Sequence, residues 1–228
     1  DGNITQTVAG VKQLTSIEGK FKGVRQGTGV GDNRYSTHSR TTITTSSKII
    51  VMAAAEIWFL RAEAALRGFT SEDVESCYKQ GVTTSFAQWD ASGVSEYLES
   101  ENTPADYVDT FDKNFDAKAT TSITPKWDNT ADNETKLERI ITQKWLAIYP
   151  EGCEAWAEQR RTGYPKLFKV VVNNSSNAIS TDDMIRRVFF NQDYITNNKP
   201  LYDALVSKLG GMDTGGTRLW WDTGKNNF

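Results

Sequence analysis

The sequence predicts a mainly α-helical fold that contains a tetratricopeptide-like helical hairpin, long loops and few short strands. Residues 53–67 are dense in helix formers and are followed at once by a second segment with helical periodicity. Residues 134–149 show the same periodicity and lead into another short helical segment. Residues 1–48 and 90–132 are rich in turn formers, so we expect them to supply the loops.

The first helix is predicted over residues 53–67, AAAEIWFLRAEAALR. Glu63 and Arg67 stand four apart in the favourable order, and Gly68 is suited to a left-handed stop after the last turn. The helix should be mostly buried, through one apolar face formed by Ile57, Leu60 and Ala64.

A second helix is predicted to follow directly and to pair with the first. Ser71 can cap it, while Glu72 and Asp73 suit the positive end of its dipole. Its buried stripe is an apolar ladder of Val74, Tyr78, Val82 and Phe86. The resulting hairpin has the length and small-residue content of a tetratricopeptide unit, and such units need about three stacked copies. The sequence therefore predicts that neighbouring repeats lie in chain that is absent here.

Further helices are predicted after residue 133. The segment 134–149 has an apolar stripe, and Pro150 stops it. A short helix over 151–161 ends at Gly163, and a last helix over 200–209 ends at Gly210. The stripe of the longest of these helices consists of Leu137, Ile141, Trp145 and Ile148.

Two segments are predicted to be largely irregular. Residues 1–48 should form loops with one or two short strands, and TTITTSSKIIV is their β-prone piece. Residues 90–132 should form loop and short helix, and long loops of this kind are often functional. Tyr97, Tyr107 and Trp127 in this second loop either anchor it by packing or reach solvent as ligand contacts.

Composition limits the classes of partner. The net charge is -3 and basic residues are spread along the chain, so nucleic acid is not an expected partner. The seven tryptophans serve either core packing or stacking on sugar rings or bases. Cys77 and Cys153 lack the CxxC spacing of zinc sites; we expect both on apolar helix faces as small hydrophobes, with a disulfide left open.

The residue types of the chain favour binding over catalysis. The single histidine, His38, lies in a polar segment and is expected at the surface. The sequence shows neither zinc-ligand spacing nor a nucleophile elbow nor a phosphate loop, so we predict no enzyme and no cofactor. A calcium ion among loop carboxylates is conceivable, although the EF-hand pattern is missing.

Three segments in this order resemble the SusD/RagB family of outer-membrane nutrient-binding lipoproteins. The first is KGVRQG and YSTHSR followed by MAAAEIWFLRAEAALRGF, and the second is ITQKWLAIYPEGCEAWAEQRRTGYP. The third is IRRVFFNQDYITNN with the terminal TRLWWD, although Met184 or Ile185 stands where the family commonly has a proline. The resemblance covers roughly residues 20–222.

The resemblance implies a SusD-like domain of which residues 1–228 form the carboxyl-terminal part, without its amino-terminal half. In such a domain, tetratricopeptide-like helical hairpins would support a loop-rich face. It implies non-catalytic, cell-surface binding of glycan and delivery to a TonB-dependent SusC-like transporter. The protein would sit at the bacterial outer membrane, held by a lipid anchor in a segment outside this chain. Its partners would be the transporter, the glycan and its own amino-terminal half.

The resemblance also singles out a structural motif, and physical character adds ligand candidates. We expect Glu154 to form partly buried bidentate pairs with Arg160 or Arg161. The motif residues are Glu154, Trp156, Arg160, Arg161, Gly163 and Tyr164. The tail should be pinned by the rings of Trp220 and Trp221 and by the Asp222 carboxylate. Candidates for gripping a sugar by hydrogen bonding or stacking are Arg25, Tyr35, Arg40, Trp89 and Trp127.

Two other functions remain open from the sequence. A glycoside hydrolase needs only two suitably spaced carboxylates, and the chain has 29 acidic residues, but no motif marks a pair. A protein-interaction scaffold is the second, because tetratricopeptide arrays commonly bind peptides in their concave groove.

Overall fold

The chain forms two compact units, each built from segments that are far apart in the sequence. The computed structural model describes residues 3–8, 11–16, 21–28, 35, 38–41, 43–47 and 49–228. Unit 1 consists of Asp1–Thr45, Asp106–Ala119 and Phe168–Thr223. Unit 2 consists of Ser46–Ala105, Thr120–Leu167 and Gly224–Phe228.

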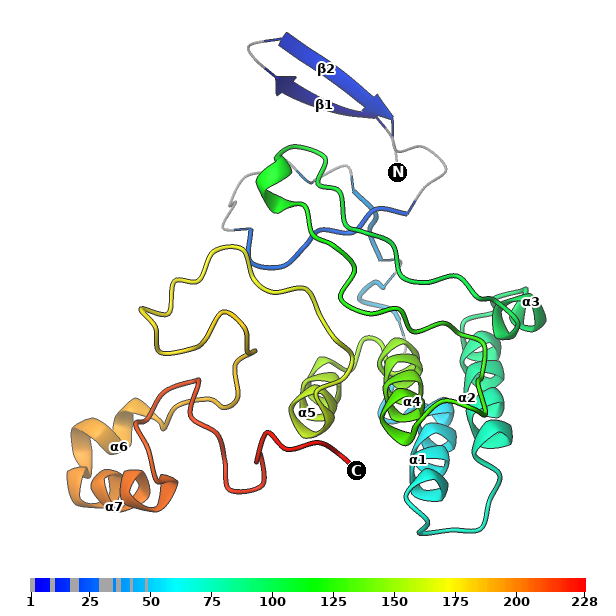
Figure 1. Cartoon of the computed structure of the whole chain (residues 1–228). Coiled ribbons are helices and arrows are strands. Elements are labelled where there is room, and N and C mark those ends of the chain that lie inside the picture. The colour runs from blue at the N-terminus through cyan, green and yellow to red at the C-terminus, as the bar shows by residue number, and fades with distance from the viewer. Residues whose placement is uncertain are drawn as a thin grey trace. The chain divides into compact units, whose positions relative to one another are not determined.

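Helices dominate the described part of the chain, so the predicted fold class is confirmed (Figure 1). Unit 1 holds the strands β1 (Asn3–Val8) and β2 (Val11–Ser16), the 3-10 helix η2 (Lys113–Phe115), α6 (Gln192–Asn197) and α7 (Lys199–Leu209). Unit 2 holds α1 (Ala54–Leu66), α2 (Val74–Gln88), α3 (Val94–Leu98), α4 (Asn133–Ala147) and α5 (Gly152–Thr162).

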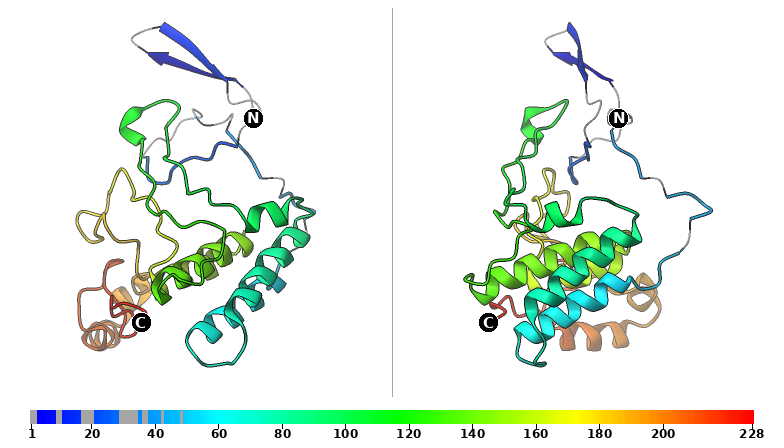
Figure 2. Two further views of the ribbon diagram at one scale, coloured as in Figure 1. Left: turned by 45° about the vertical axis from the view of Figure 1, so that its right-hand side comes forward. Right: turned by 90° about the vertical axis from the view of Figure 1, so that its right-hand side faces the viewer.

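The helices α1 and α2 form the predicted antiparallel hairpin (Figure 2). Gly68 ends the first helix with a φ of +74°, as its position predicts. The predicted cap of the second helix is wrong: Asp73 rather than Ser71 caps α2, because its carboxylate accepts the backbone N–H of Ser76 at 2.7 Å. Gly81 of α2 lies so close to Phe59 of α1 that a β-carbon would be 2.8 Å from the ring.

The buried face of α1 differs from the predicted one. Ile57 and Leu60 are exposed, whereas Ala55, Phe59 and Ala62 pack in the core. The helix is apolar on two faces, so periodicity alone could not decide between them. Alanines let neighbouring helices approach closely, and α2 and α4 both pack against α1.

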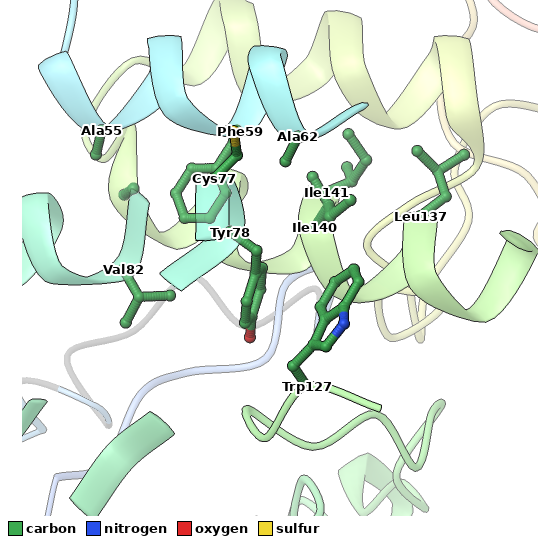
Figure 3. Close-up of a cluster of buried hydrophobic side chains, with 11 residues drawn as sticks. Ala55, Phe59, Ala62, Cys77, Tyr78, Val82, Trp127, Leu137, Ile140 and Ile141 are labelled. Carbon is green, nitrogen blue, oxygen red and sulfur yellow. The ribbon is translucent and has the colours of Figure 1, made fainter. Parts of the chain in front are cut away.

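Helix α4 completes the core of unit 2 (Figure 3). Its buried residues include Leu137, Ile140 and Ile141, which confirms most of the predicted stripe, while Trp145 is only partly buried. Trp127 approaches the helices from the loop, and its ring lies 5.1 Å from that of Tyr78. Of the two interpretations left open for this tryptophan, the structure therefore supports packing.

The remaining helices lie close to their predicted positions, with one addition. The φ angles of Gly163 and Gly210 are +81° and +75°, so both glycines end their helices in the left-handed region as predicted. The sequence analysis missed α6, a helix of six residues with a polar sequence, whose first turn is capped by the Asn191 side chain. Short polar helices of this kind carry little apolar periodicity.

The two strands lie outside the piece of sequence that was named as β-prone. β1 and β2 pair antiparallel, from Asn3 opposite Ser16 to Val8 opposite Val11. Among the described residues of 41–51, none belongs to a strand. Strand propensity has an effect only where a partner satisfies the backbone groups.

The two cysteines have different environments. Cys77 is buried in the core of unit 2, as predicted, and Cys153 is exposed on α5, so its predicted burial is wrong. Both are free thiols. In the described part of the chain, every helix falls short of the length and apolar character that crossing a bilayer requires.

Candidate functional site

A buried network of charges joins α1, α4 and α5 in unit 2. The Lys144 ammonium is only 1% exposed and lies 3.3 Å from Glu56, 3.0 Å from Glu154 and 3.1 Å from Glu158. Burial lowers the pKa of Lys144, but the charges of Glu158 and Glu154 outweigh it and hold the pKa above its ordinary value. Lys144 therefore stays charged inside the protein.

Arg161 extends this network to the end of α1. Its guanidinium binds Glu63 through two bonds of 2.6 Å and Glu158 through one of 2.7 Å, and Arg67 adds a bond of 2.8 Å to Glu63. Burial raises the pKa of Glu63, but the two arginines outweigh it and keep the pKa below its ordinary value. Arg161 is thus a bidentate arginine, as expected, but it binds Glu63 and Glu158, whereas Glu154 accepts from Lys144 at 3.0 Å.

The other motif residues lie around the end of α5. The Arg160 guanidinium stacks on the Trp156 ring at 3.7 Å from its centroid. The Tyr164 hydroxyl donates to Glu134 at 3.0 Å, and burial together with that carboxylate raises the pKa of the tyrosine. Both of these contacts join residues of unit 2.

The last residues of the chain dock on the same part of unit 2. The Asn227 side-chain amide donates to Glu134 at 3.2 Å and to the Thr162 carbonyl at 3.0 Å. Arg67 donates to the Asn227 carbonyl at 3.1 Å and lies over the Phe228 ring. Sequence analysis could not anticipate this contact, since Asn227 lies in a polar tail without periodicity.

In unit 1, Asp109 organises a buried polar cluster that includes the candidate Tyr35. The Asp109 carboxylate accepts the hydroxyls of Tyr35 at 3.1 Å and Tyr107 at 3.0 Å, and the backbone N–H groups of Phe111 and Asp112. Burial raises the pKa of Asp109, but these donors outweigh it and the pKa lies below its ordinary value. Burial and Asp109 raise the pKa of Tyr107 to about 12.

His38 joins this cluster, so its predicted position at the surface is wrong. It is buried, its ring packs edge-on against Tyr35 at 5.0 Å, and its Nε2 lies 3.1 Å from the Thr110 hydroxyl. Burial and the charge of Lys22 lower its pKa, so the ring is neutral at neutral pH. The rings of Tyr35 and Phe111 shield His38 from solvent, although the neighbouring residues in the sequence are polar.

The candidate Arg25 binds protein backbone. Its guanidinium donates to the carbonyls of Phe115 at 3.0 Å, Asp116 at 3.1 Å and Lys169 at 2.6 Å. These bonds join three segments of unit 1, which is a structural role. Arg40, the third candidate from this region, is exposed.

Trp89 is the aromatic candidate that presents its ring to solvent. It follows α2 and is 44% exposed, and its ring centroid lies 6.3 Å from that of Tyr149, which follows α4 and is 46% exposed. The two ring planes are inclined by 48°. We call Trp89 and Tyr149 the aromatic pair. The sequence analysis missed Tyr149, whose only signal was an aromatic residue placed just before the helix stop at Pro150.

The expectation for the tail around residue 220 is half correct. The Asp222 carboxylate accepts two bonds of 2.7 Å from Arg186 and one of 2.6 Å from Arg218, as expected of an acceptor for nearby donors. Trp221 is partly buried, but Trp220 is almost fully exposed, so the expected pinning by its ring is wrong. Among the residues that the structure describes, no cluster of three or more metal-ligating side chains is placed to hold a metal ion.

Comparison with known proteins identifies the family. The SusD-like family model, described as SusD and RagB outer membrane lipoprotein, matches residues 5–222. The chain belongs to the SusD-like family. No curated protein sequence matches it.

Solved structures of SusD homologues agree in fold and in sequence. A homologue from Bacteroides vulgatus is 51% identical, with a TM-score of 0.84, over 92% of this chain and 44% of its own. A chitin-binding homologue from Flavobacterium johnsoniae is 46% identical, with a TM-score of 0.76, over 79% of this chain and 38% of its own. A homologue from Bacteroides thetaiotaomicron is 36% identical, with a TM-score of 0.83, over 91% and 46%. The SusD-like chain thus spans less than half the length of these relatives.

Proposed function

We propose that this SusD-like protein binds glycan at the bacterial cell surface without catalysis and delivers it to a TonB-dependent SusC-like transporter. Membership of an outer membrane lipoprotein family supports the location. The 46% identity to a chitin-binding homologue supports the class of ligand, and makes β-linked amino-sugar oligosaccharides the first ligands to test.

The aromatic pair is the observation that carries the glycan proposal. Sugar rings present apolar C–H faces, which stack on flat aromatic rings, while their hydroxyls need nearby polar groups. Trp89 and Tyr149 offer two half-exposed rings from neighbouring helix ends. Asp90 directly follows the tryptophan and Glu151 lies two residues after the tyrosine, so carboxylate acceptors flank the rings in sequence.

Three buried carboxylates have the electrostatics of structural groups rather than of the acid in a glycosidase. A glycosidase needs a carboxylic acid that is protonated near neutral pH, which requires a raised pKa. Glu63, Asp109 and Asp222 instead have pKa values below the ordinary range, because cations or N–H and O–H donors outweigh the effect of burial. Such groups remain ionised and hold structure together.

Tryptophan fluorescence of the full-length protein, titrated with a panel of oligosaccharides that includes chitin oligosaccharides, tests the proposal. We expect saturable quenching by one glycan class without release of reducing ends. Trp89→Ala should raise the Kd at least about tenfold, equivalent to about 1.4 kcal/mol. Trp220→Ala is the matched control, since it removes another exposed indole and should leave the Kd unchanged.

The outcomes separate the alternatives. Release of reducing ends would support a glycoside hydrolase, and the absence of any response in the whole panel would favour a protein-interaction scaffold. A glycan that binds Trp89→Ala as tightly as the unchanged protein would exclude the aromatic pair as the site. The delivery step is tested separately, by asking whether a SusC-like transporter co-purifies with the protein from outer membranes.

A further inference from the structure

Three aromatic rings of unit 1 hold together two segments that are far apart in the sequence. Tyr35 and His38 belong to the first segment, and Phe111 belongs to the loop 106–119. The Tyr35 ring meets that of Phe111 edge-on at 5.3 Å. The His38 ring lies 5.0 Å from Tyr35 and 6.1 Å from Phe111, and the residue is only 4% exposed. We call these three residues the ring cluster, and any charge on its imidazole would be buried.

The imidazole of His38 makes one hydrogen bond and leaves its second nitrogen without one. Its Nε2 lies 3.1 Å from the Thr110 hydroxyl, which can donate or accept. Its Nδ1 is buried and has no hydrogen-bond partner in the described part of the chain. A neutral imidazole has one N–H donor, whereas a protonated one donates from both nitrogens. Protonation would therefore bury a charged N–H group without a well-placed acceptor, which is costly.

The charges around the ring act in opposite directions. The Lys22 ammonium, which donates to the Val108 carbonyl, opposes a second positive charge on His38. The Asp109 carboxylate and the Tyr35 carbonyl favour a protonated ring. However, the carboxylate already accepts two hydroxyls and two backbone N–H groups, and burial together with Lys22 has the larger effect. The pKa of His38 therefore lies below its ordinary value while the ring cluster is closed.

We infer that the ring cluster is an acid-sensitive switch, in which protonation of His38 releases Tyr35 and His38 from the loop 106–119. An imidazole that reaches water takes up a proton below about pH 6.5, so acid favours the open state. The ratio of open to closed protein should rise by up to about tenfold per pH unit below that value, until the buried ring itself titrates.

The neighbouring acids of the ring cluster do not titrate in the same pH range. The pKa of Asp109 lies below its ordinary value, because hydroxyl and N–H donors outweigh its burial. Burial and Asp109 raise the pKa of Tyr107 to about 12. Both groups therefore keep their charge state between pH 7.5 and 5.5, and a change of the loop in this range is due to His38.

Hydrogen exchange of the full-length protein at pH 7.5 and 5.5, corrected for the pH dependence of intrinsic exchange, tests the switch. Protection of residues 106–119 should fall about five- to tenfold at the lower pH, while protection of α4 stays constant. His38→Gln keeps a polar side chain that cannot take up a proton, so its loop should show no such fall. Arg40→Gln is the matched control, since Arg40 is exposed in the same segment, and it should behave like the unchanged protein.

An equal fall of protection in His38→Gln and in the unchanged protein would overturn the switch, and so would a fall that extends to α4. If His38→Gln lacks protection of the loop at both pH values, NMR of histidine labelled with carbon-13 decides instead. The His38 signal, assigned by its absence from the variant, should titrate clearly below pH 6.5 in the unchanged protein. Titration at or above pH 6.5 would contradict the inference.

Discussion

The ammonium group of Lys144 lies inside unit 2 and is neutralised by carboxylates from two helices. Glu56 comes from α1, while Glu154 and Glu158 come from α5, so one side chain of α4 holds both neighbours. Isolated charges are costly to bury, and pairs are tolerated only when their geometry and hydrogen bonds are good. The network therefore fixes where α5 sits rather than adding much net stability.

Replacing Lys144 by alanine should be strongly destabilising. The change leaves three carboxylates close together without their cation, and breaking a buried pair typically costs about 3–5 kcal/mol. Chemical denaturation followed by circular dichroism measures the loss of unfolding free energy. Lys79→Ala is the control, because Lys79 pairs with Glu75 on the exposed surface of α2 and its loss should cost less than about 1 kcal/mol. Equal losses for both variants would contradict this account.

The Glu63 carboxylate should give the protein an acid-sensitive contribution to stability. Its pKa is below the ordinary value in the folded protein, so its stabilisation is complete above the ordinary pKa and is lost as pH falls through the folded one. Glu63→Gln should be less stable at pH 7, and the difference should shrink below about pH 5. Denaturation at a series of pH values measures this difference, with the exposed Glu96→Gln as control. A difference that stays constant with pH would refute this role for Glu63.

At the scale of the helices, the α1–α2 hairpin depends on a close approach at Gly81. A β-carbon there would be 2.8 Å from the Phe59 ring, so Gly81→Ala should destabilise by about 1–3 kcal/mol through overpacking. Gly152→Ala is the matched control, because nothing lies within 4 Å of its added carbon and alanine favours a helix. Thermal melting checks both, and a neutral Gly81→Ala would mean that the hairpin is more loosely packed than the structure shows.

Helix positions could be predicted from the sequence, but the direction of each face could not. Stop signals such as Gly68 and Gly163 act locally, so their positions fixed the ends of the helices correctly. The face of α1 depends on what packs against it, and its two apolar stripes are equivalent until α2 and α4 are placed. The same reason explains why Trp220 and Cys153 are exposed. Tryptophan and cysteine are commonly buried, but in the described part of the chain no neighbouring element covers these two side chains.

For the whole molecule, the contacts that define the candidate sites join residues far apart in the sequence. Glu63 and Arg161 are 98 positions apart, and periodicity carries no information about such a pair. The motif at the end of α5 predicted that its arginines form ion pairs, because arginine binds carboxylates wherever the two are close. Their partners became identifiable only with the fold. Resemblance to a family therefore predicted the architecture better than it predicted individual contacts.

Unit 1 is assembled from three separate segments, so its stability should depend on the few side chains that join them. Arg25 binds carbonyls of Phe115, Asp116 and Lys169, and thereby connects all three segments. A hydrogen bond from a charged donor to a carbonyl stabilises a folded protein by about 1.5–3 kcal/mol. The Arg25 guanidinium should therefore contribute strongly to the stability of a unit with little regular structure. If the Arg25 guanidinium is removed, local unfolding should begin in the three segments that it joins.

Arg25→Ala should therefore loosen unit 1 by about 2–3 kcal/mol and leave the core of unit 2 unchanged. Hydrogen exchange followed by mass spectrometry should show faster exchange in residues 106–119 and 168–172, with unaltered protection of α4, because every acceptor of Arg25 lies in unit 1. Lys113→Ala, an exposed change in the same unit, should leave all three regions as they were. Equally faster exchange in α4 would mean that the chain unfolds as one cooperative body. In that case Arg25 would stabilise the whole molecule rather than unit 1 alone.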